Sequence, residues 1–128
     1  MTTTSTLSNF FSNLQNHTTT QRVSMINLKT KTIQQVVELL INEGYLRGYV
    51  ELQNQRLLIL LKYKKNLPYY NKITFLSKPG RRKYVTNAWL NQQKSDQGIY
   101  IVSTSKGFMT HYLAIHENVG GELICHIS

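Results

Sequence analysis

The apolar residues of this chain come in short runs with two different periodicities, and this restricts the fold more than any other feature. Leu7, Phe10, Phe11 and Leu14 are spaced i, i+3, i+4 and i+7, which is typical of one helix face. In residues 55–63, apolar side chains instead alternate between two faces, as in a strand. Because helix-length and strand-length runs follow one another along the chain, the sequence predicts an α+β fold.

The first half of the chain predicts an α-β-α-β-β unit. Ser8 or Asn9 is expected to cap the first helix and Thr32 the second, with Gly44 at the position that ends the second helix. The predicted elements are a helix to about residue 15, a strand over 22–28, a helix from 32, and a hairpin of strands 48–52 and 55–63.

Lys64, Lys65, Asn66 and Pro68 interrupt the pattern, which predicts a boundary between residues 1–66 and 67–128. The second unit is expected to be mostly β with one helix. Its predicted elements are strands over 73–77, 83–85, 98–103 and 122–127, a helical turn capped by Asn87, and a helix over about 110–117.

The charge of the chain favours a polyanionic partner. Its 128 residues include 15 Lys and Arg against 6 Asp and Glu, for a net charge of +9. Such an excess is typical of nucleic-acid-binding proteins, although a solvated cationic surface is the alternative. No apolar run approaches the ~20 residues that span a bilayer.

Ser103, Thr104 and Ser105 are followed by Lys106 and Gly107 at the end of a predicted strand. Short hydroxyl side chains can approach the 2′-hydroxyls and base edges of a shallow RNA minor groove. The glycine would let the backbone come close, and the lysine suits a phosphate. A capping turn before the next helix is the alternative, and the segment by itself leaves both open.

A second segment places cations and a ring after a tight turn. Pro79 and Gly80 fit a type II turn, and Arg81, Arg82 and Tyr84 follow it. The turn would fix the direction of the cations, and the ring could stack on an exposed base or sugar. A charge run is otherwise usually a solvated face.

Together with the closing V-G-G-E-L-I-C, these two segments resemble the small-subunit ribosomal protein eight family, from about residue 7 to 128. The resemblance implies two units packed side by side that bind a helix in the central domain of small-subunit rRNA, support assembly of the platform and contact neighbouring small-subunit ribosomal proteins. The residues implied to bind RNA are Thr30, Lys31, Lys78, Pro79, Gly80, Arg81, Arg82, Tyr84, Ser103, Thr104, Ser105, Lys106 and Gly107.

The chain also departs from this family. Asn13, Gln15 and Asn16 stand where arginines are usual, and residues 111–115 replace an acidic residue and arginines. Contacts that relatives make through those charges are therefore not carried over. A second functional class is a translational repressor, which would bind an mRNA that imitates the rRNA site.

Catalytic and cofactor-binding patterns are not found in the sequence. His111 and His116 are five residues apart, which is off one helix face, and Cys125 lies in an apolar run as a buried side chain. We therefore expect no enzyme activity, no metal or other cofactor, no small-molecule substrate and no membrane partner.

The first 20 residues are rich in Ser and Thr but contain no basic residue, so they do not fit a transit peptide. Abundant Asn, Lys, Ile and Tyr with little Ala are typical of an AT-rich coding genome. Together these features favour synthesis inside an organelle, and hence a mitochondrial ribosome. A plastid or a bacterial cytoplasm is the alternative.

Overall fold

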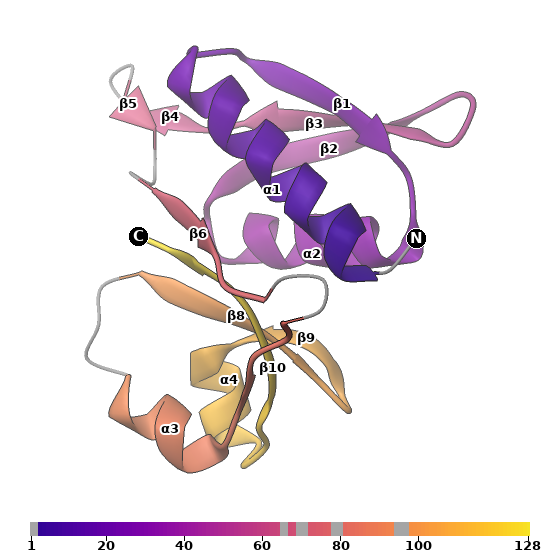
Figure 1. Ribbon diagram of the computed structural model, residues 1–128. Helices are drawn as coiled ribbons and strands as arrows, with labels where there is room; N and C mark the ends of the chain where they lie inside the picture. Colours follow the sequence, from indigo (N-terminus) through magenta and orange to yellow (C-terminus); the bar gives the residue numbers. More distant parts are fainter. Residues whose placement is uncertain (1–2, 65–66, 69–71, 78–80, 94–97) are drawn as a thin grey trace.

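The computed structural model of the protein describes residues 3–64, 67–68, 72–77, 81–93 and 98–128. Figure 1 shows two α/β units, each with its own helices. The helices are α1 (Thr3–Thr19), α2 (Lys31–Asn42), α3 (Asn87–Gln92) and α4 (His111–His116). The strands are β1 (Ser24–Leu28), β2 (Leu46–Leu52), β3 (Arg56–Leu61), β4 (Tyr63–Lys64), β5 (Leu67–Pro68), β6 (Ile73–Phe75), β7 (Tyr84–Val85), β8 (Ile99–Thr104), β9 (Gly107–Thr110) and β10 (Gly121–Ile127). The predicted α+β fold with two small units is confirmed.

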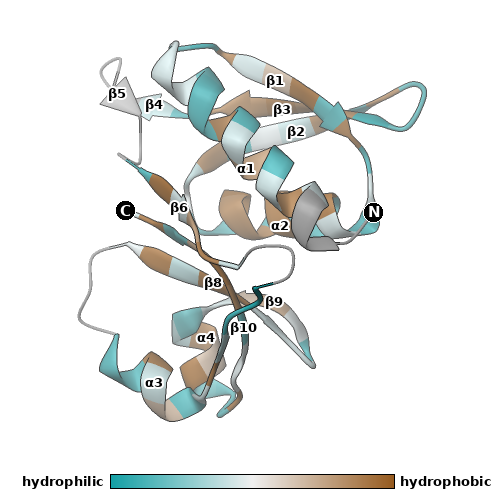
Figure 2. Ribbon diagram, viewed as in Figure 1, coloured by the Kyte–Doolittle hydropathy of each residue, from teal (hydrophilic) through white to brown (hydrophobic). Residues whose placement is uncertain are grey.

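The N-terminal unit is an antiparallel sheet of order β1-β3-β2 with two helices on one face. Strand β3 is central and hydrophobic along most of its length (Figure 2). Leu57, Ile59 and Leu61 alternate toward the helices and are buried, together with Met25 of β1. The opposite face leaves apolar side chains exposed, as Ile26 of β1 illustrates. Side chains therefore alternate along β3 between the face that the helices cover and the opposite face.

The C-terminal sheet has the order β6-β10-β8-β9, and β7 also pairs with β10. Both faces of this sheet contribute buried side chains to a core. Ile101 and Cys125 on one face join the core under α1 and α2, while Val102 and Leu123 on the other face pack under α3 and α4. The first of these two cores contains residues of both units, and this shared core fixes the orientation of the second sheet against the first.

Helix boundaries differ from the predicted ones, because other hydroxyls act as caps. Thr30, rather than Thr32, accepts a hydrogen bond from the Ile33 N–H at 3.1 Å, so α2 begins two residues earlier. Thr86, rather than Asn87, caps α3 in the same way. The first helix runs from Thr3 to Thr19, so the predicted caps at residues 8–9 and the end near residue 15 were wrong.

Several strands are shorter than predicted, and β9 was predicted as a loop. Gly44 does follow α2 with a positive φ of 85°, as expected for a residue ending a helix. The boundary at 66/67 stays a prediction, since Lys65 and Asn66 lie outside the described residues. No helix in the described part of the chain is long and apolar enough to cross a membrane.

We predict that Cys125 reacts slowly with alkylating reagents in the folded protein. Its side chain is buried on all sides, and burial raises the pKa of its thiol, so the reactive thiolate is suppressed. Labelling should be at least about 100-fold slower than in urea, where the thiol has its ordinary pKa near 8.5. Fast labelling of the folded protein would contradict the assignment of Cys125 to the core.

The same shift gives a pH dependence. As pH rises above about 8.5, the unfolded thiol ionises while the folded thiol stays protonated, so the free energy of unfolding should fall. A Cys125→Ala variant has no thiol, so this part of the fall in the free energy of unfolding at alkaline pH should disappear. Urea denaturation of both proteins at pH 8 and pH 10 would measure the difference.

Candidate nucleic-acid interface

Strand β10 brings the two predicted RNA-binding segments onto one sheet face. Glu122 of β10 is the register partner of Tyr84 in β7 and of Ser103 in β8, and Ser103 is in turn paired with Phe108 in β9. Directly opposite residues of an antiparallel pair project to the same face, with Cβ atoms about 5 Å apart. Tyr84, Glu122, Ser103 and Phe108 therefore form a continuous cross-strand row.

This close pairing depends on glycine. A Cβ atom on Gly121 would lie 2.2 Å from the carbonyl oxygen of Ser103, and one on Gly120 would lie 2.5 Å from that of Val85. Both distances are far below any real Cβ contact, so only glycine lets β10 approach the backbones of β7 and β8 at this end. The Gly-Gly pair consequently sets the spacing of the row.

The hydroxyl segment is a tight hairpin rather than the predicted loop. The Thr104 hydroxyl donates to the Gly107 carbonyl at 2.9 Å and accepts from the Lys106 N–H at 3.1 Å, which holds the turn closed. Ser105 and Lys106 are exposed at the tip. The Lys106 Nζ lies 3.4 Å from the Glu117 carboxylate, a weak pair that an RNA phosphate could replace.

The cationic segment is fastened to β10 by backbone and hydroxyl bonds. The buried Ser77 hydroxyl donates to the Leu123 carbonyl at 2.6 Å and accepts from the Lys83 N–H at 3.1 Å. The Leu123 N–H in turn donates to the Lys83 carbonyl at 2.8 Å. These bonds hold both ends of the segment, so its exposed side chains are presented from a fixed base. Sequence reasoning placed Ser77 next to the turn but did not assign it this role.

Arg81, Arg82 and Tyr84 are exposed, and the Tyr84 side chain is 67% accessible. The two arginines, with Lys83, line an open pocket of about 490 Å³ beside Phe75 and Leu76. Lys83 also lies with its Nζ 5.6 Å from the centre of the Trp89 ring. Lys78, Pro79 and Gly80, which are also predicted to contact RNA, lie outside the described residues.

Thr30 and Lys31 lie on the N-terminal unit, at the start of α2, and are not part of the cross-strand row. Both are exposed, and the Thr30 hydroxyl already accepts a helix N–H. Further along α2, Gln35, Glu38 and Asn42 line a crevice of about 260 Å³ together with Lys106, Gly107 and Phe108 of the hairpin. Helix α2 therefore extends from Thr30 and Lys31 to the hairpin of β8 and β9.

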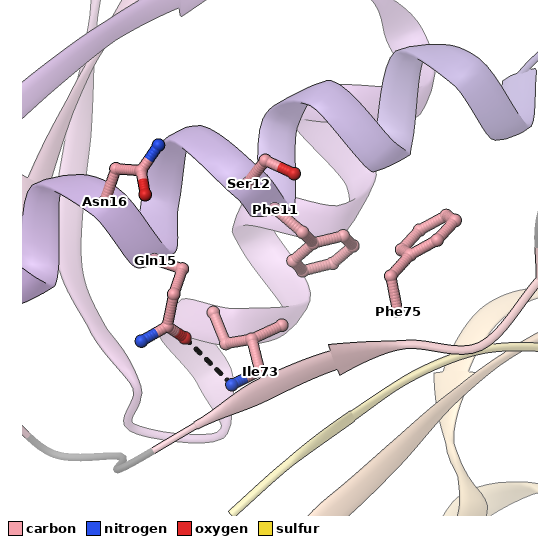
Figure 3. Close-up of a pocket in the computed structure, with 6 residues that line it drawn as sticks. All are labelled: Phe11, Ser12, Gln15, Asn16, Ile73 and Phe75. Carbon is pink, nitrogen blue, oxygen red and sulfur yellow. Dashed lines mark hydrogen bonds between the residues drawn. The ribbon is translucent and has the colours of Figure 1, made fainter.

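Gln15 makes a structural contact at the end of α1. Its Oε1 accepts a hydrogen bond from the Ile73 backbone N–H at 2.9 Å, which ties α1 to the edge strand β6 (Figure 3). Phe11 and Phe75 close the adjacent pocket of about 330 Å³, with ring centres 6.0 Å apart. The helix end is thus engaged with the C-terminal sheet.

Within the described residues, no group of His, Cys, Asp and Glu side chains is arranged to hold a metal ion. His111 is buried, and its Nδ1 accepts from the Tyr100 backbone N–H at 3.0 Å, which assigns this ring to the core beside α4. The row, the hairpin tip and the cationic segment together form the candidate interface.

We predict that Gly121→Ala lowers the free energy of unfolding by about 1–3 kcal/mol, because the methyl group would force β10 and β8 apart. Gly48→Ala is the matched control: a Cβ there meets nothing within 4 Å, so its effect should stay within about 0.5 kcal/mol. Urea denaturation measures both. Equal effects for the two variants would contradict the close approach described here.

Comparison with known proteins gives a consistent result. Residues 5–128 match the family model described as Ribosomal protein S8. The small ribosomal subunit protein uS8 of Brucella ovis is 43% identical over 102 residues, covering 77% of each chain. The uS8 of Allorhizobium ampelinum is 34% identical over 131 residues, covering 99% of each. These relatives are ribosomal proteins and not enzymes, in agreement with the expectation from the sequence. The chain belongs to the ribosomal protein S8 family.

Proposed function

We propose that this protein is a structural constituent of the small ribosomal subunit that binds a helix in the central domain of small-subunit rRNA and supports assembly of the platform. The observation that carries the proposal is the cross-strand row, which joins the hydroxyl hairpin and the cationic segment on one face. The relatives are small ribosomal subunit proteins, which supports the assignment to this subunit.

Affinity and selectivity have different sources in this proposal. The net charge of +9 supplies affinity for the phosphate backbone, through displacement of counterions. Ser103 and Ser105 have no hydroxyl hydrogen bond within the described residues, so they are available to 2′-hydroxyls and base edges of a minor groove. The hydroxyl of Thr104 is engaged in the turn and keeps one acceptor site.

Tyr84 would stack on a base or sugar, and Gly107 would permit close approach. The complete set that we propose to contact RNA consists of Thr30, Lys31, Lys78, Pro79, Gly80, Arg81, Arg82, Tyr84, Ser103, Thr104, Ser105, Lys106 and Gly107. Neighbouring small-subunit ribosomal proteins are the proposed protein partners. For the compartment, the AT-rich residue usage supports a mitochondrial ribosome, whereas the bacterial relatives fit the alternative of a bacterial cytoplasm.

Translational repression is the second candidate, because the same surface would accept an mRNA that imitates the rRNA site. Sedimentation of ribosomes followed by mass spectrometry separates the two. A constituent co-migrates with the small subunit in equal amount, whereas a dedicated repressor stays in the soluble fraction.

We predict that Ser105→Ala and Lys106→Ala weaken RNA binding in different ways. Loss of the exposed Ser105 hydroxyl should reduce affinity for the specific rRNA helix about five- to hundredfold, since one or two hydrogen bonds are worth about 1–3 kcal/mol. Binding to arbitrary duplex RNA should change little. Lys106→Ala should weaken both and lower the slope of log affinity against log salt by about one.

Filter binding at several salt concentrations measures these effects, and a melting curve of each variant is the control. For the unchanged protein we expect a log–log salt slope of magnitude at least about 3, counted from Lys31, Arg81, Arg82 and Lys106. A flat salt dependence would contradict groove binding. If Ser105→Ala melts earlier while its folded fraction binds normally, the hairpin is structural only.

A further inference from the structure

The carboxylate of Glu122 lies in the middle of the cross-strand row and has no partner among the described residues. Its Oε2 is completely buried without a hydrogen bond, and the side chain makes no ion pair within the described residues. Three of the four other described acidic residues are engaged: Glu38 accepts from Tyr49, and Glu51 and Glu117 pair with lysines. An unpaired, poorly hydrated carboxylate is costly, so its position between Tyr84 and Ser103 calls for an explanation.

The charge of Glu122 restricts what can approach it. The carboxylate would repel a phosphate, so the RNA backbone must pass to one side of Glu122. The arginines of the neighbouring cationic segment can bind the phosphates there. A carboxylate accepts hydrogen bonds only, and its ligand must therefore be a donor. In a minor groove the base-edge donor is the N2 amino group of guanine, since the other bases present acceptors there.

The neighbours of Glu122 in the row suit such a base edge. The Tyr84 ring is exposed on one side, and Ser103 on the other side offers a short hydroxyl that can donate or accept. Phe108, half-buried beyond Ser103, closes the far end of the row with an apolar ring. Limited contact of the carboxylate with water strengthens any hydrogen bond that it accepts.

We propose that Glu122 is a specificity-determining residue that accepts a hydrogen bond from the N2 amino group of a guanine in the minor groove of the bound RNA. This inference rests on the proposed function, because it requires that the row faces an RNA helix. It adds a chemical identity to that site: the recognised helix must present a guanine amino group at the point between Tyr84 and Ser103.

Nucleotide analogue interference tests the proposal. The probe is a transcript of the small-subunit rRNA of Brucella ovis in which inosine, which lacks the N2 amino group, replaces guanosine at random tagged positions. The protein selects the transcripts that it binds. For the unchanged protein, inosine should be depleted about tenfold from the bound fraction at one guanosine within the protected helix, because a hydrogen bond to a charged group is worth about that factor or more.

The variant Glu122→Met removes both carboxylate oxygens, leaves only a weakly accepting thioether sulfur and keeps the length of the side chain. With this variant, the depletion of inosine at that guanosine should fall below about twofold, while interference at other positions should remain unchanged. Glu43→Met is the matched control, since Glu43 is an exposed glutamate at the end of α2, and it should keep the full depletion. Glu122→Gln retains one acceptor oxygen and should be intermediate.

Each outcome decides between the proposals. If the unchanged protein protects no rRNA helix, the proposed function fails. If it protects a helix but inosine never interferes there, only the role of Glu122 fails, and this result needs no variant to fold. Persistent inosine interference with Glu122→Met overturns it too. If Glu122→Met suppresses the interference of a 2′-deoxynucleotide and not that of inosine, the carboxylate contacts a ribose hydroxyl. That result would overturn the assignment to guanine.

Discussion

The antiparallel pairing of β10 with its neighbours is the interaction on which the rest of the structure depends. This one strand pairs with β6, β7 and β8, and its two faces supply side chains to two cores. Cys125 and Ile127 pack toward the N-terminal helices, whereas Leu123 packs under α3 and α4. Ladder hydrogen bonds and apolar burial therefore act through the same residues, so neither unit can shift without disturbing the other.

The candidate interface is a consequence of that pairing. Tyr84 and Ser103 are distant in sequence, and only their shared partner Glu122 places them on one face. The glycines before Glu122 permit the approach, and Ser77 fastens the cationic segment to the same strand. Positioning is thus assigned to buried backbone contacts, while the exposed side chains remain available to a ligand. Such a division is typical of sites in which rigid elements present the binding groups.

Local patterns in the sequence predicted the element types well and the long-range arrangement hardly at all. The amphipathic spacing of α2 and the positive φ of Gly44 follow from residues close in sequence. Cap positions were predicted wrongly where nearby hydroxyls compete: Thr32 was expected to cap α2, but Thr30, two residues before it, is the cap. Strand β9 was missed because four residues beginning with glycine carry a weak strand signal.

The candidate site shows the same limit. The residue types and the resemblance predicted that the hydroxyl and cationic segments bind RNA, and this stays a prediction. The row that joins them could not be predicted, since strand register depends on pairing across the sheet, including the register shift in β10 between Leu123 and Cys125. Glu122 was predicted only as part of a closing strand, and the lack of a partner for its carboxylate among the described residues becomes visible only once its neighbours are placed.

The central claim is that both segments contact one RNA helix. Cleavage by iron chelates tethered to single cysteines tests it most directly, in a Cys125→Ala background. Lys83→Cys lies in the cationic segment, and Glu117→Cys lies beside Lys106 of the hydroxyl hairpin. Chelates at both positions should cut the same helix of small-subunit rRNA within a few base pairs. Gln53→Cys, on the β2–β3 hairpin, should cut elsewhere or not at all. If the chelates at 83 and 117 cut unrelated helices, the two segments do not form one interface and the account is wrong.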